Sequence, residues 1–322
     1  MKNNEVKIVV LDRDSIGMDI DISYFSKLGM VEEHGTGNLE DTKAWIKDAD
    51  IIVFNKKKMN EELLKDAKKV KLLCITATGY DNIDLEYTKK RGIVATNIRG
   101  YSTASVAQHT MSLALYLIEK LPYYDEYVKS GKYSGQQAFS HFSESFYELS
   151  GKTWGIVGLG TIGKAVAKLA EAFGCHVIYH SVSGNKQETR YPYVSFSDLL
   201  EKSDVISIHT PLSDLSRDLF NAEAFLKMKK TGILINVARG PIVNEQDLYQ
   251  AIINEEIGAA GLDVLAKEPM RVDNPLLKIK DSRKLFITPH LAWASVESRT
   301  RGMQEVYKNM ESFTRKIERN VL

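Results

Sequence analysis

Residues 153–163 read TWGIVGLGTIG, an apolar run that leads into a glycine-rich turn. The run Thr153–Val157 is typical of a short buried strand, and residues 164–173 carry apolar side chains at helical spacing. In the turn, Gly158 permits a tight bend, Gly160 lets a pyrophosphate approach the backbone, and Gly163 lets the helix pack on the strand. The helix N-terminus adds N–H groups and a partial positive charge for phosphates. This context predicts a dinucleotide-binding unit in the middle of the chain.

Strand-like and helix-like segments alternate on both sides of this fingerprint, which predicts parallel sheets covered by helices. Before it, we expect strands at residues 7–11, 51–54, 72–75 and 93–95, and helices at 39–47, 61–68 and 85–90. After it, we expect strands at 176–179, 205–209, 232–236, 259–263 and 285–288, helices that start at Ser197, Asn221 and Asn244, and an amphipathic helix at 295–316. The predicted fold class is α/β, with two doubly wound parallel-sheet domains.

Two segments between the halves have other patterns. Residues 102–121 predict a long helix that is apolar around most of its circumference and therefore buried. Near its start, His109 is expected to be a satisfied structural histidine rather than a ligand. Residues 122–150 are rich in tyrosine and phenylalanine, and we interpret them as irregular structure. Contact with a neighbouring subunit and packing into the core both stay open for these aromatic side chains.

Composition limits the class of protein. A length of 322 residues favours two domains. With 43 Lys and Arg against 42 Asp and Glu, the net charge of +1 does not favour a nucleic-acid partner. Cys74 and Cys175 lie in apolar segments without a CxxC pattern, so we expect buried thiols and no metal. Neither a signal peptide nor a membrane span is expected, which predicts a soluble cytoplasmic protein.

Polar residues follow the predicted strands of the second half, at the sheet edge where ligands bind in open parallel sheets. Arg239 can bind a carboxylate with two parallel hydrogen bonds, His290 can transfer a proton near neutral pH, and Glu268 can orient that histidine. Each has a simpler interpretation, as a phosphate clamp, a helix cap or a turn carboxylate. Their joint placement favours catalysis beside a nicotinamide cofactor.

Several motifs resemble, in order and spacing, those of the D-isomer-specific 2-hydroxyacid dehydrogenases. They are GLGTIG at 158–163, HTPL at 209–212, NVARG at 236–240, AKEP at 266–269, TPH at 288–290 and ATGYDNID at 77–84. The segments YSTASVAQHT at 101–110 and HLAWAS at 290–295 are similar to the glycerate dehydrogenase (hydroxypyruvate reductase) branch. The resemblance implies a flavodoxin-like substrate domain of residues 1–100 and 294–322, with an inserted NAD(P)-binding Rossmann domain of residues 101–293.

The resemblance also implies roles. Arg239 would hold a 2-oxo acid, His290 would protonate its carbonyl oxygen, and Glu268 would hydrogen-bond His290 and favour its protonated form. Substrate-binding residues would be Thr78, Gly79, Arg239, His290 and Trp293. Cofactor-binding residues would be Gly158, Gly160, Thr161, Ile162, Gly163, His180, Ser181, Thr210, Pro211, Val237, Ala238, Arg239, Asp263, His290 and Ala292. Closure of a cleft would exclude water, and the chain would form a homodimer through its nucleotide domains.

The cofactor and the substrate are less determined. Ser181 stands where NAD enzymes usually place an acidic residue, and no arginine is nearby to attract a 2′-phosphate. We favour NAD(H), while NADP(H) stays possible through Ser181, Ser183, Asn185 and Lys186. The similar branch suggests hydroxypyruvate or glyoxylate, reduced to glycerate or glycolate, although Trp293 could also line a pocket for a bulkier substrate. The alternative is an NAD(H)-sensing binding protein similar to the C-terminal-binding corepressors, which the lack of a basic DNA-contacting segment disfavours.

Overall fold

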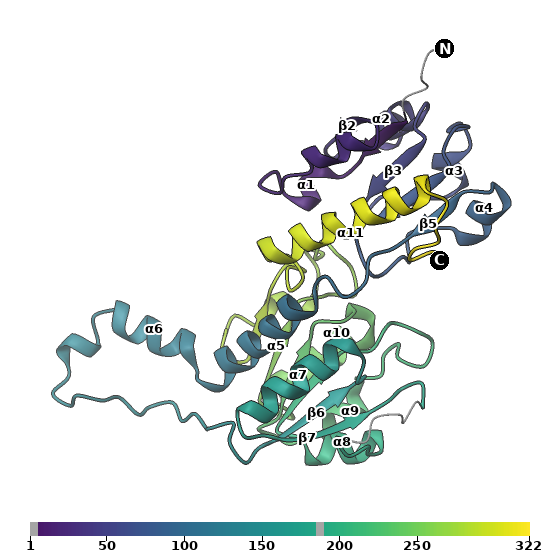
Figure 1. Ribbon diagram of the computed structural model, residues 1–322. Coiled ribbons are helices and arrows are strands. Elements are labelled where there is room, and N and C mark those ends of the chain that lie inside the picture. The colour runs from purple at the N-terminus through teal and green to yellow at the C-terminus, as the bar shows by residue number, and fades with distance from the viewer. Residues whose placement is uncertain (1–5, 185–189) are drawn as a thin grey trace, which may run out of the picture. The chain divides into compact units, whose positions relative to one another are not determined.

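The computed structural model describes residues 6–184 and 190–322. The chain divides into two compact units (Figure 1): unit 1 comprises Met1–Ser102 and Ala294–Leu322, and unit 2 comprises Thr103–Trp293. Two of the residues considered above for NADP(H), Asn185 and Lys186, lie outside the described residues. No helix in the described ranges is both long enough and apolar enough to cross a membrane.

Unit 1 is built on a parallel sheet whose described strands follow the order β2-β1-β3-β4-β5, the flavodoxin-like order. Its strands are β1 (Lys7–Val10), β2 (Met30–Glu33), β3 (Ile51–Phe54), β4 (Leu72–Ile75) and β5 (Val94–Thr96). Its helices are α1 (Arg13–Ile16), η1 (Ser23–Lys27), α2 (Leu39–Ile46), α3 (Glu61–Leu64), α4 (Leu85–Lys90) and α11 (Val296–Thr314). Both β3 and β4 are buried along their whole length, as parallel strands covered on two faces require.

The structure corrects two predicted details in unit 1. The strand β2 was not predicted, because its sequence MVEE is polar at one end and lies at the exposed edge of the sheet. The helix α3 ends at Leu64 rather than at residue 68, because the backbone continues in tight turns. In those turns the Ala67 N–H donates to Leu64 O and the Lys68 N–H donates to Asp66 O.

Three asparagines connect the C-terminal segment of unit 1 to the loop after β4. Asn320 Nδ2 donates to Asn309 Oδ1 (3.0 Å), Asn309 Nδ2 donates to Asn97 O (2.8 Å), and Asn97 Nδ2 donates to Thr78 O (2.8 Å). The Asn309 side chain projects from α11 and is only 1% exposed. Because buried amides must be hydrogen-bonded, this chain of bonds holds the loop at Thr78 in a defined shape.

Replacing Asn309 by alanine is expected to destabilise the protein by about 1–3 kcal/mol, because the buried partners lose their hydrogen bonds. Urea unfolding followed by circular dichroism would measure the change. The control is Gln304→Ala, an exposed position on the same helix. Equal stability of the two variants would show that the asparagine chain contributes nothing to folding.

Unit 2 contains a second parallel sheet, whose described strands follow the order β11-β10-β9-β8-β6-β7. Its strands are β6 (Thr153–Val157), β7 (His176–His180), β8 (Val205–Ile208), β9 (Ile233–Asn236), β10 (Ala259–Leu262) and β11 (Leu285–Ile287). Its helices are α5 (Thr103–Ile118), α6 (Leu121–Lys129), η2 (Tyr133–Gly135), α7 (Thr161–Ala172), α8 (Phe196–Lys202), α9 (Ala222–Lys227), η3 (Gly240–Ile242), α10 (Glu245–Ile253) and η4 (Pro275–Lys278).

Alternate residues of the central strands of unit 2 face opposite cores. Along β9, Ile233 and Ile235 pack with residues of α5 and α7, whereas Leu234 packs with residues of α8, α9 and α10. Helices therefore cover both faces of this sheet, and the predicted α/β class with two doubly wound parallel sheets is confirmed. The predicted start of α8 is wrong by two residues: Ser195 rather than Ser197 caps it, and the Ser195 Oγ accepts from Asp198 N.

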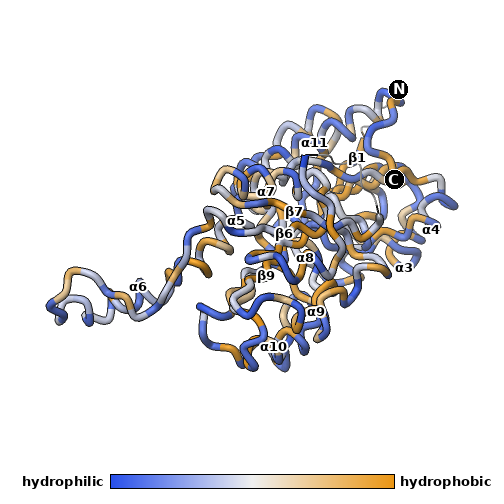
Figure 2. Tube along the Cα trace, turned by 90° about the horizontal axis from the view of Figure 1, so that it is seen from below, coloured by the Kyte–Doolittle hydropathy of each residue, from blue (hydrophilic) through white to orange (hydrophobic). Residues whose placement is uncertain are grey.

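Residues 121–150 form a projecting arm rather than a wholly irregular segment. The chain turns at Lys120 and then forms α6, with Pro122 in the first turn, where a missing N–H is tolerated. In Figures 1 and 2, α6 and the chain that returns from it extend away from the rest of unit 2. Phe139 and Phe142 on this arm are 89% and 85% exposed, which excludes core packing for these two side chains.

Candidate functional site

The structure gives a different physical reason for glycine at each of the three fingerprint positions. Gly158 adopts φ +92°, and a Cβ there would lie 2.8 Å from Thr210 N, so the tight turn requires glycine. A Cβ on Gly163 would overlap the carbonyl oxygen of Gly158. The absence of a side chain at Gly163 therefore lets α7 pack closely on β6. A Cβ on Gly160 would meet nothing within 4 Å, so the backbone there is open to a bound group. This is the arrangement a pyrophosphate needs.

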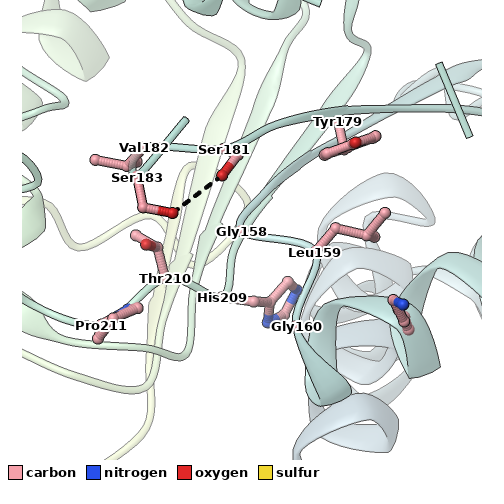
Figure 3. A pocket seen from close by; sticks show the side chains of 11 residues that line it. Gly158, Leu159, Gly160, Tyr179, Ser181, Val182, Ser183, His209, Thr210 and Pro211 are labelled. Atoms are coloured by element: carbon pink, nitrogen blue, oxygen red, sulfur yellow. Dashed lines mark hydrogen bonds between the residues drawn. The ribbon is translucent and has the colours of Figure 1, made fainter. Parts of the chain in front are cut away.

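A cavity of about 270 Å³ opens beside this turn (Figure 3). It lies where the sheet order reverses, because β7 pairs with one side of β6 and β8 with the other. This is the position at which doubly wound sheets bind ligands. The residues that line it come from the glycine turn, from the start of α7 and from the ends of β7 and β8: Gly158, Leu159, Gly160, Lys164, Tyr179, Ser181, Val182, Ser183, His209, Thr210 and Pro211.

The cavity lining is polar and contains no carboxylate among the described residues. The Ser181 and Ser183 hydroxyls lie 3.3 Å apart at one side of it (Figure 3). The His209 Nε2 lies 3.0 Å from Ser207 Oγ, and loss of solvent around the imidazole lowers the pKa of His209 to about 3, so it is neutral at physiological pH. The lining therefore contributes hydrogen-bonding groups, and Lys164 is its only cationic residue among those described.

Not every residue predicted to contact the cofactor lines this cavity. Thr161 and Ile162 form the first turn of α7, where backbone N–H groups have no partner within the helix. His180 lies at the end of β7, and its Nδ1 is 3.1 Å from Val194 O. Lys164 lines the cavity but was missed in the sequence, although its place directly after the fingerprint could have indicated it.

A second group of polar residues follows three neighbouring strands of the same sheet, β9, β10 and β11. Arg239 follows β9, in a loop shaped by the fully buried Asn236, whose amide donates to Arg239 O (2.9 Å) and accepts from Ala238 N (3.0 Å). The next residue is Gly240, and a Cβ there would overlap the backbone of Leu265. The loop that carries Arg239 therefore packs directly against the loop that leads to Glu268. Val237 and Ala238, predicted to contact the cofactor, lie in this same loop between Asn236 and Arg239.

Glu268 and His290 form a close pair. Their Oε2 and Nδ1 atoms lie 2.6 Å apart, and Glu268 Oε1 also accepts from Leu265 N (3.0 Å). Both side chains are partly exposed, at 34% for Glu268 and 28% for His290. Because Glu268 occupies Nδ1, the other ring nitrogen of His290 is the one left to exchange a proton with a substrate. The carboxylate fixes both the orientation of the ring and its tautomer.

Asp263 supports the loop that contains His290. This aspartate is 1% exposed and its carboxylate accepts from Leu291 N (2.8 Å), Ala292 N (2.9 Å) and Thr288 Oγ1 (2.6 Å). These bonds satisfy a buried charge and at the same time fix the backbone on both sides of His290. The indole of Trp293 then donates to His290 O (3.0 Å).

The remaining predicted substrate residues, Thr78 and Gly79, lie in unit 1. The Thr78 hydroxyl donates to Ile98 O (2.9 Å), and Thr78 O accepts from Asn97. The structure therefore brings Glu268 and His290 together, places Arg239 on the adjacent loop of unit 2, and holds Thr78 in a separately braced loop.

Unit 2 thus combines a dinucleotide-type cavity with a guanidinium and an imidazole–carboxylate pair at strand ends of one sheet. An arginine can bind a carboxylate in its planar fork, and a histidine held by a glutamate can donate a proton to a carbonyl oxygen. The donors around Gly160 and the first turn of α7 fit a nicotinamide dinucleotide, because that backbone is open and the turn ends at a helix N-terminus.

Comparisons with known proteins agree with this chemistry. Residues 111–292 match the family model described as D-isomer specific 2-hydroxyacid dehydrogenase, NAD binding domain. The chain is 35% identical over 323 residues to a hydroxypyruvate reductase of Blautia hydrogenotrophica, covering 98% of this chain and 99% of that protein. It is also 35% identical over 320 residues to a glycerate dehydrogenase of Methylorubrum extorquens, with 98% of each chain covered.

A solved structure is similar over almost the whole chain. The NADPH-dependent glyoxylate/hydroxypyruvate reductase of Sinorhizobium meliloti, solved with NADP and malonate, aligns with a TM-score of 0.81 and 27% identity, covering 96% of this chain and 94% of that one. The motifs, the fold and these relatives lead to one conclusion. The chain belongs to the D-isomer specific 2-hydroxyacid dehydrogenase family and is similar to its glycerate dehydrogenase and hydroxypyruvate reductase members.

Proposed function

We propose that hydroxypyruvate or glyoxylate is the 2-oxo acid that this NAD(P)-dependent dehydrogenase reduces, giving glycerate or glycolate. The names of the similar proteins support this choice, since they are hydroxypyruvate reductase, glycerate dehydrogenase and glyoxylate/hydroxypyruvate reductase. The observation that carries the proposal is the Glu268–His290 pair, 2.6 Å apart, in the loops that follow β10 and β11 of the sheet beside which the dinucleotide-type cavity lies.

Arg239, His290 and Glu268 have different roles in the proposed reaction. Arg239 binds the substrate carboxylate and the carbonyl oxygen, which orients the 2-oxo acid. His290 donates a proton to that oxygen, and Glu268 holds the imidazole through Nδ1. A bound reduced nicotinamide supplies the hydride to the carbonyl carbon. Thr78, Gly79 and Trp293 are proposed to bind the substrate as well.

The cofactor is proposed to be NAD(H) in preference to NADP(H). No arginine lines the described part of the cavity beside Ser181, so a 2′-phosphate lacks its usual fork-shaped partner. The lack of a carboxylate in the lining leaves NADP(H) as a tolerated second cofactor. Steady-state kinetics with NADH and NADPH test this preference, and a strong preference for NADPH would overturn it.

A panel of 2-oxo acids with purified protein tests the proposed substrates. Hydroxypyruvate and glyoxylate are expected to give the highest kcat/KM, ahead of pyruvate and bulkier 2-oxo acids. Higher kcat/KM for a 2-oxo acid with a large side chain would overturn the proposed substrate class. Absence of turnover with the whole panel, while NADH still binds, would favour the NAD(H)-sensing alternative.

Substituting alanine for Gly163 is expected to weaken NADH binding by at least about tenfold, or ~1.4 kcal/mol. The added Cβ would overlap backbone at Gly158, so the turn must shift away from the geometry that a pyrophosphate needs. Fluorescence titration with NADH would measure the change. Gly135→Ala is the matched control, because a Cβ at Gly135 meets nothing within 4 Å. Equal affinities of the two variants would contradict the role assigned to Gly163.

The protein is also proposed to form a homodimer through unit 2, with the projecting arm contributing to the contact. Four aromatic side chains on the arm are more than half exposed, which a stable partner surface would cover: Phe139, Phe142, Phe146 and Tyr147. Light scattering that shows a monomer at micromolar concentration would contradict this. The buried, reduced Cys74 and Cys175 support the further proposal of a cytoplasmic location.

A further inference from the structure

A partly buried histidine on α5, His109, is hydrogen-bonded to residues that support the His290 loop. The Nε2 of His109 lies 3.0 Å from Thr288 Oγ1, and that hydroxyl donates to Asp263 Oδ1 at 2.6 Å. A hydroxyl has a single hydrogen, and Thr288 gives it to Asp263. The Thr288 oxygen is therefore the acceptor for His109, which assigns the hydrogen of His109 to Nε2.

The charge state of His109 fits this assignment. Burial lowers the pKa of His109, and the charge of Asp263, 3.7 Å from Nε2, opposes that shift only in part. The ring is therefore neutral at physiological pH, and a neutral ring protonated on Nε2 donates one hydrogen bond there. As a result, His109 donates a hydrogen bond to Thr288, and Thr288 donates one to Asp263.

The other end of this chain controls the backbone of His290. This residue has φ +54°, in the left-handed region that residues other than glycine seldom adopt. Such a conformation persists only when its neighbours hold it. Asp263 holds this conformation with three hydrogen bonds. Its carboxylate accepts from Leu291 N and Ala292 N, and its backbone carbonyl accepts from His290 N (2.8 Å).

We propose that His109 is a positioning residue for proton transfer, acting through Thr288 and Asp263 on the loop that holds His290. Its Nε2–H keeps the Thr288 hydroxyl turned toward Asp263, and Asp263 in turn keeps the His290 ring facing both Glu268 and the substrate. This inference rests on the proposed function, since it assigns His109 a part in the reaction that His290 performs. The sequence alone marked His109 only as a satisfied structural histidine.

The consequence concerns the rate of the chemical step more than binding. Loss of the His109 hydrogen bond leaves the cavity beside Gly160 untouched, because His109 is not part of its lining. It loosens the angular position of the His290 ring, and small errors in the position of a catalytic group slow the reaction strongly. A residue with only a packing role would change stability without such a selective effect on kcat.

The test compares His109→Phe, which keeps a planar ring without the donor, with His109→Gln, whose amide nitrogen can donate at the Nε2 position. The expected result for His109→Phe is a fall in kcat of about tenfold or more, with KM for hydroxypyruvate and the dissociation constant of NADH changed less than about twofold. His109→Gln should recover most of the lost rate. The control is Ser112→Ala, exposed on the same helix.

Thr288→Val is the second variant, because it breaks the same chain from its middle without altering α5. The double variant His109→Phe/Thr288→Val should be no slower than the slower single variant, since both remove one connected network. Wild-type kcat in His109→Phe, equal defects in the Phe and Gln variants, or additive defects in the double variant would each overturn the proposal. If His109→Phe fails to fold, a wild-type kcat in Thr288→Val overturns it. Wild-type protein without turnover would instead refute the proposed function.

Discussion

Replacement of His290 by alanine is expected to lower kcat/KM for the 2-oxo acid by about 10²–10⁴-fold, the usual contribution of a general acid. The variant loses the group that we propose as the proton donor to the carbonyl oxygen, and Glu268 is left without the imidazole it holds at 2.6 Å. The cavity beside the fingerprint does not include His290, so NADH binding should stay close to that of the wild type. Stopped-flow oxidation of NADH and a fluorescence titration would measure the two quantities separately.

The control for this substitution is His176→Ala, which removes an exposed histidine at the start of β7 in the same unit. It should leave kcat/KM unchanged. Near-normal activity of the His290 variant would show that another group donates the proton, and the role assigned to His290 would be wrong. A parallel loss of NADH affinity would mean that the substitution disturbs the nucleotide site instead.

Replacement of Arg239 by lysine is expected to lower kcat/KM by about 10²-fold, mainly through a higher KM, because an ammonium keeps the charge but cannot form the two parallel hydrogen bonds of a guanidinium. The loop at this position is held by Asn236 and by the close approach of Gly240 to Leu265. The backbone therefore cannot move to compensate for the shorter side chain of lysine. Initial-rate kinetics over a range of 2-oxo acid concentrations would separate KM from kcat.

Arg217→Lys provides the matched control, since Arg217 is an exposed arginine of the same unit. It should have wild-type kinetics. If Arg239→Lys also has an unchanged KM, the carboxylate of the substrate is bound elsewhere, and Thr78 and Gly79 become the first residues to test.

The strands were predictable where they are apolar along their whole length. The ranges of β3, β4 and β6 agree with the sequence-based prediction, because buried parallel strands form continuous apolar runs between polar turns. The edge strand β2 lacks such a run. The helix α6 escaped prediction because its tyrosines have weak helical preference, and its support comes from Pro122 in the first turn and the Asp125–Lys129 pair.

The candidate site shows a similar division. The motifs could be recognised in the sequence, because the spacing of the glycines predicts the phosphate-binding turn and polar residues at strand ends predict a site. They indicated Gly158, Glu268 and His290 as candidate residues. The hydrogen bonds that support the site could not be predicted from the sequence, because they join residues far apart in the chain. Asp263 bonds the backbone at Ala292, and His109 bonds Thr288 across 179 positions. The pairing of β10 with β11 brings Asp263 next to the loop after β11, and the packing of α5 on the sheet brings His109 next to Thr288.

The proposed reaction is tested most directly by identifying the product that the purified wild-type protein forms from hydroxypyruvate and NADH. We expect one equivalent of NADH to be oxidised for each D-glycerate formed, with the L-isomer absent in chiral chromatography. Binding of NADH without its oxidation, with hydroxypyruvate and with glyoxylate alike, would contradict the assignment of this chain as a reductase of small 2-oxo acids.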